Sequence, residues 1–95
     1  MLKDLDQVIY FHRCRTVEEV LAIRRQYLAV SPDIAVLVVD MSALDPVAPD
    51  AHLVGVLTNM RRFFAAHVEI RLSRYPGYLP NFLSVCRLER QFILW

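Results

Sequence analysis

DIAVLVVDMSAL, residues 33–44, carries the strongest structural signal in the chain. From Ile34 to Val39 the sequence is apolar without alternation, which is typical of a strand covered on both faces in the middle of a parallel sheet. Polar residues follow at once, beginning with Asp40 and Ser42. Because open α/β sheets bind ligands and partners beyond the carboxyl ends of their strands, we expect the binding edge of the protein at this strand end.

The segments around this strand alternate between strand and helix signals. Thr16-Val17-Glu18-Glu19 predicts a capping box at the start of a helix, and Pro32 ends that helix. The other expected elements are a strand at 8–11, a helix at 50–64, a strand with one wet face near the sheet edge at 67–73, a short helix at 79–87 and a strand at 92–95. The sequence therefore predicts a single small α/β domain, residues 1–95, with a mostly parallel sheet of four to five strands in the order βαβαβαβ.

The helix at 50–64 has the clearest amphipathic pattern in the sequence. Its apolar stripe, which we expect to face the core, consists of Leu53, Val56, Leu57, Met60, Phe63 and Phe64. The residues expected to face solvent are His52, Asn59, Arg61 and Arg62.

Composition limits the kinds of partner. Of 95 residues 56% are hydrophobic, so apolar surface is left for a protein partner or for a weak homodimer, through the strand at 92–95 or an uncovered helix face. A net charge of +1 with scattered arginines argues against nucleic acid. Charges interrupt every apolar run, so we do not expect membrane insertion, and residues 1–6 lack a signal-like stretch, which favours the cytoplasm.

The sequence contains no pattern of a catalytic or metal site. Cys14 and Cys86 lack further ligands at zinc spacing and are expected to be reduced structural thiols. Asp40 and Asp45 are more simply read as loop residues that accept backbone hydrogen bonds than as metal ligands. Two glycines cannot form a phosphate-binding loop. We therefore expect no enzyme activity, no cofactor and no metal.

Several segments resemble the STAS domain, the family of anti-sigma-factor antagonists and of the cytoplasmic tails of sulfate transporters. The stretch Val38-Val39-Asp40-Met41-Ser42-Ala43-Leu44 resembles the family's buried strand, which ends in an aspartate. Residues 86–93 resemble the small-Leu-x-x-x-Phe step in which the family's last short helix closes. Two features depart from the family. The family usually has two strands before its first helix, whereas here residues 8–11 form the one convincing strand and residues 2–5 are no more than a stub. Ala48-Pro49-Asp50-Ala51 stands where the family has a phosphorylatable Asp-Ser pair.

The resemblance implies a non-catalytic regulatory protein-interaction module that lacks the usual phosphorylatable serine. Its partner would be an anti-sigma factor or kinase, or a transporter subunit. Asp50 would supply a fixed negative charge at the start of a helix. The residues expected to bind the partner are Asp40, Ser42, Leu44, Asp45, Val47 and Asp50.

Two alternatives remain open at this point. The stretch from Thr16 through Asp40 also resembles part of a response-regulator receiver, although the acidic pair and the late lysine of that family have no counterpart. The other alternative is a small α/β domain that binds a small ligand at the edge from Asp40 to Asp50.

Overall fold

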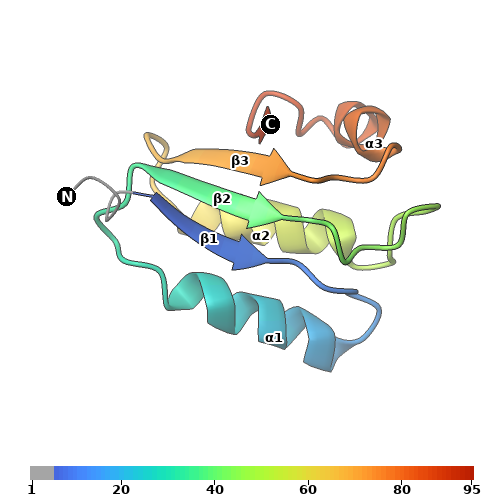
Figure 1. The fold of residues 1–95 in the computed structure, drawn as a ribbon, viewed down its shortest axis with the longest axis horizontal. Helices are drawn as coiled ribbons and strands as arrows, with labels where there is room; N and C mark the ends of the chain where they lie inside the picture. The colour runs from blue at the N-terminus through green and yellow to red at the C-terminus, as the bar shows by residue number, and fades with distance from the viewer. Residues whose placement is uncertain (1–5) are drawn as a thin grey trace.

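A computed structural model describes residues 6–95, which form four strands alternating with three helices (Figure 1). The elements are β1 (Asp6–Tyr10), α1 (Val17–Leu28), β2 (Val36–Asp40), α2 (Leu53–Phe63), β3 (Glu69–Ser73), α3 (Leu79–Val85) and β4 (Ile93–Leu94). All strand pairs are parallel, in the order β1-β2-β3-β4. The predicted α/β fold with βαβαβαβ order is confirmed, and the suggested stub at 2–5 lies outside the described residues.

The strand order has a consequence for the two faces of the sheet. Each crossover leads from one strand to the next neighbour, always in the same direction across the sheet. Crossovers that share one handedness therefore place all their connecting segments on the same side of the sheet. In Figure 1, α2 lies behind the sheet, α1 runs along β1, and none of the described helices lies in front. The order also never reverses, so the sheet has no switch point at which adjacent loops diverge to open a crevice.

Burial along β2 follows this one-sided arrangement. Leu37 and Val39 are fully buried, whereas Val36 and Val38, which point to the other face, are only half-buried. The prediction that this strand is covered on both faces is therefore wrong. The apolar run arises because the side chains on the uncovered face of β2 are also mainly apolar.

The core lies between the covered face of the sheet and the helices. Its fully buried members include Leu37, Val39, Ile70 and Leu72 from the strands and Leu53, Leu57 and Met60 from α2. No helix within residues 6–95 has the length and apolarity needed to cross a bilayer.

The predicted capping box of α1 is confirmed. The Glu19 backbone N–H donates to Thr16 Oγ1 at 3.2 Å, and the Glu19 carboxylate accepts from the Thr16 backbone N–H at 3.2 Å. Two donors at the helix start are thus satisfied.

The ends of α2 differ from the prediction. The helix begins at Leu53, three residues later than expected, and its N-cap residue His52 makes no side-chain capping bond. Arg61 does not point freely to solvent, because its guanidinium donates to the carbonyl oxygens of Ala65 at 2.7 Å and Val68 at 2.9 Å. Phe63 is half-exposed rather than buried. These arginine contacts stabilise the turn between α2 and β3, since they tie the last turn of the helix to carbonyls of that turn.

The edge strands offer little free backbone. At β1, the Tyr10 N–H donates to Gln26 Oε1 at 2.8 Å, and Gln26 Nε2 donates to the Tyr10 carbonyl at 2.6 Å. The opposite edge is β4, which has two residues rather than the four expected at 92–95. β3 shows the predicted alternation of buried and half-buried residues, but it lies between β2 and β4 and is not an edge strand. Short or covered edges disfavour strand addition.

Candidate functional site

The most buried of the predicted site residues is Asp50, which is the only polar or charged residue in the buried class among those described. Its Oδ1 lies 2.7 Å from Arg13 Nη2, its Oδ2 lies 2.9 Å from Arg13 Nε, and Oδ2 also accepts from the Cys14 backbone N–H at 2.8 Å. The hydrogen bond from Arg13 is the main reason that the pKa of Asp50 falls below its ordinary value. Asp50 thus ties the segment after β1 to the loop before α2.

This geometry differs from the role that we expected for Asp50. The carboxylate does not cap α2, which begins at Leu53, and its charge is neutralised by Arg13 rather than presented at a helix start. Arg13 also lies 3.3 Å from Asp45, so one guanidinium serves two carboxylates of the loop.

The other carboxylates of the loop also find donors close by. Asp40 Oδ1 accepts from the backbone N–H of Ser42 at 2.9 Å and from its hydroxyl at 2.6 Å, and these bonds lower the pKa of Asp40. Asp45 Oδ1 accepts from the Val47 N–H at 2.8 Å. The loop is therefore held in shape mainly by its own polar residues.

The structure brings the six predicted residues into one loop region but presents them differently. Leu44 and Asp50 are buried, Asp40 and Asp45 are half-buried, and Ser42 and Val47 are exposed. In this conformation a partner reaches mainly Ser42 and Val47. Within residues 6–95, no three His, Cys, Asp or Glu side chains are grouped so that they could hold a metal ion. Cys14 is buried, and desolvation raises its thiol pKa to about 11.

A larger exposed feature is the uncovered side of the sheet, which we call the open sheet face. The strand register aligns Val8, Val38, Arg71 and Ile93 in one row, and Val36 beside Glu69 in the next. Val8 is 51% exposed, Tyr10 59%, Ile93 44% and Trp95 63%. The open sheet face consists of Val8, Tyr10, Val36, Val38, Asp40, Glu69, Arg71, Ser73, Ile93 and Trp95. Asp40 and Ser73 lie in the row of Tyr10. The other residues of the face are apolar except for one pair of opposite charges, Glu69 and Arg71.

That pair lies on β3. The Arg71 guanidinium forms a salt bridge with Glu69 and lies 5.0 Å from the centroid of the Trp95 ring. Cation–π contact of this kind favours a fixed position for both side chains. The sequence has no local signal for this face, because Val8, Ile9 and Tyr10 are all apolar although only Ile9 is buried.

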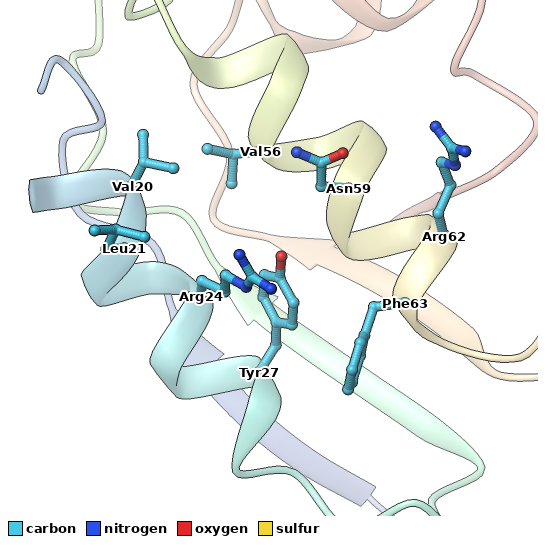
Figure 2. A pocket seen from close by; sticks show the side chains of 8 residues that line it. All are labelled: Val20, Leu21, Arg24, Tyr27, Val56, Asn59, Arg62 and Phe63. Carbon is cyan, nitrogen blue, oxygen red and sulfur yellow. The ribbon is translucent and has the colours of Figure 1, made fainter. Parts of the chain in front are cut away.

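A second exposed feature is a groove of about 540 Å³ between α1 and α2 (Figure 2). Figure 2 shows Arg24 beside Tyr27 on the α1 side and Phe63 on the α2 side. The rings of Tyr27 and Phe63 lie 5.4 Å apart. Within the described part of the chain, neither Arg24 nor Arg62, which also lines the groove, forms a salt bridge. The groove therefore combines aromatic and aliphatic side chains with a cationic rim.

Comparisons of the chain with protein-family models, with curated proteins and with solved structures find no match.

Proposed function

We propose that the chain is a non-catalytic regulatory protein-interaction module of the STAS type, and that it binds its partner through the open sheet face. The observation that carries this proposal is the uncovered side of the sheet, on which Val8 and Tyr10 at one edge and Ile93 and Trp95 at the opposite edge are well exposed, with half-buried Val36 and Val38 between them. Contiguous apolar surface on a small protein commonly marks a site of protein contact. The order of elements that the resemblance requires, from the strand ending at Asp40 to the short helix α3, supports the family assignment.

The partner expected from the resemblance is an anti-sigma factor or kinase, or a transporter subunit. Its contact surface would be mainly apolar, because charges placed anywhere except opposite Glu69 and Arg71 would lose hydration without gaining ion pairs. The proposed location is the cytoplasm, where Cys14 and Cys86, which form no disulfide, would stay reduced.

The loop before α2 offers no phosphorylation switch in this proposal. Residues 45–51 contain no Ser, Thr or Tyr, and the nearest hydroxyl along the sequence, that of Ser42, donates to Asp40. Binding would therefore not depend on phosphorylation of this loop. Phosphate incorporated at Ser42 by a copurifying kinase, detected by mass spectrometry, would contradict this part of the proposal.

The test uses two variants, each with one photoreactive amino acid. One variant carries it in place of Trp95, at the end of the open sheet face. The control variant carries it in place of Glu89, an exposed residue outside the strands. Cross-linking in cells should capture one protein in stoichiometric amounts from the first position only. That protein, once purified, should bind the chain saturably in calorimetry, and Val8→Glu should weaken binding at least tenfold. Equal capture from both positions, or unchanged affinity of Val8→Glu, would reject the proposal.

The α1–α2 groove favours a second candidate function, the binding of an anionic apolar small molecule. Arg24 would meet the anion, and Tyr27 and Phe63 the apolar part. Anilinonaphthalene sulfonate is a suitable probe, and its site can be mapped by amide NMR. Saturable shifts at α1 and α2 that Arg24→Glu removes would favour this function, whereas shifts confined to the strands would reject it.

A further inference from the structure

We infer that the open sheet face binds a second copy of this chain, face to face, about a twofold axis that passes over Ile70 of β3. Glu69 of each protomer then meets Arg71 of the other. The inference rests on the proposed function, because it names one partner for the same surface.

The charge pattern of the face supports a second copy as the occupant. A twofold interface must be complementary to itself, so that each group meets its opposite after the rotation. Glu69 and Arg71 lie two residues apart on one strand, with Ile70 between them. Rotation about an axis over Ile70 exchanges their positions, and each charge then faces the opposite charge of the other protomer.

The apolar residues follow the same rotation. The register pairs Val36 with Glu69 and Val38 with Arg71. The axis that exchanges the two charges therefore also brings Val36 of one protomer over Val38 of the other. On β2, apolar side chains thus meet apolar side chains. Sheets that pack in this way lie about 10 Å apart with strand directions within roughly 30°.

Other routes to a dimer are less favourable in this structure. Gln26 occupies the backbone groups of Tyr10 at the β1 edge. β4 offers only two residues at the opposite edge. The α1–α2 groove carries cations without acids on its rim, so two copies would repel each other there.

The size of the face predicts a weak dimer. Three strands of five residues and one of two give a footprint smaller than roughly 20 Å by 17 Å. This is well below the roughly 800 Å² per partner of a stable complex. We therefore expect weak association, which analytical ultracentrifugation between about 10 μM and 1 mM can detect.

The decisive experiment uses opposite charge reversals. Glu69→Arg leaves two cations on the face and Arg71→Glu leaves two anions, so each variant alone should be monomeric at 0.5 mM. An equimolar mixture of the two should associate at least as tightly as the wild type, and the double variant E69R/R71E should regain the homodimer. Glu89→Arg and Arg25→Glu change the net charge equally at exposed positions outside the sheet and should dimerise like the wild type.

Each outcome decides the inference. Association of the mixture but of neither single variant supports the twofold arrangement. A wild type that stays monomeric at 1 mM, or a mixture that does not associate although circular dichroism shows both variants folded, overturns it. Neither result alone rejects the proposed function, which fails if cross-linking from Trp95 and from Glu89 captures the partner equally or if a purified heterologous partner binds independently of Val8.

Discussion

The loop between β2 and α2 and the open sheet face differ in how far the chain satisfies its own side chains. In the loop, Asp40, Asp45 and Asp50 all accept hydrogen bonds from neighbours within the chain. On the sheet face, Val8 and Trp95 have no covering layer among the described residues. The contrast teaches that a conspicuous cluster of acids can be scaffold, while the surface with most left to bury is apolar.

The largest expected effect concerns the scaffold side of this comparison. Asp50→Ala removes a buried carboxylate that holds Arg13 and the Cys14 N–H, and should lower the free energy of unfolding by about 2–3 kcal/mol. Urea unfolding followed by circular dichroism measures the loss, with exposed Asp33→Ala as the control. A change below about 0.5 kcal/mol would break the comparison, because the loop would then not depend on its internal bonds.

The same carboxylate should make stability depend on pH. Hydrogen bonding to Arg13 lowers the pKa of Asp50 in the folded state below its unfolded value of about 3.9, so the stabilisation is complete above that pH and is lost as the pH falls through the folded value. Asp50→Asn should be less stable at pH 7 and show a flatter profile from pH 5 to pH 2. Parallel profiles for Asp50→Asn, Asp33→Asn and the wild type would show that Asp50 does not contribute.

A smaller effect is expected at the start of α1, another place where the chain satisfies its own polar groups. Thr16→Ala removes the acceptor for the Glu19 N–H and should cost about 1 kcal/mol in the free energy of unfolding. Thr16→Ser keeps a hydroxyl and should retain most of the stability. Equal losses in the two variants would assign the effect to packing rather than to capping.

The smallest effect on stability is expected on the open sheet face. Val8→Thr keeps a β-branched residue at a half-exposed strand position, so the free energy of unfolding should change by less than about 0.5 kcal/mol. Self-association should nevertheless weaken in sedimentation experiments. A loss of stability as large as that of Asp50→Ala would mean that the face is part of the core.

The sequence was most informative where the signals are local. The capping box at Thr16 and the alternation of strands and helices depend on neighbours a few residues apart, and both were predicted correctly. The bond from Arg13 to Asp50 joins residues 37 positions apart and has no local signature. The uncovered face depends on strand order, which Val36 and Val38 cannot reveal because both are apolar.

The central claim is that the open sheet face is the surface through which this protein binds a second copy of itself. Amide NMR spectra recorded from about 20 μM to 1 mM test it most directly, because concentration-dependent shifts identify the residues that meet a second copy. We predict shifts centred on Val8, Val38, Arg71 and Ile93, with residues 42–48 unchanged. Shifts centred on residues 42–48 or on the α1–α2 groove, or no shifts at all, would contradict the account.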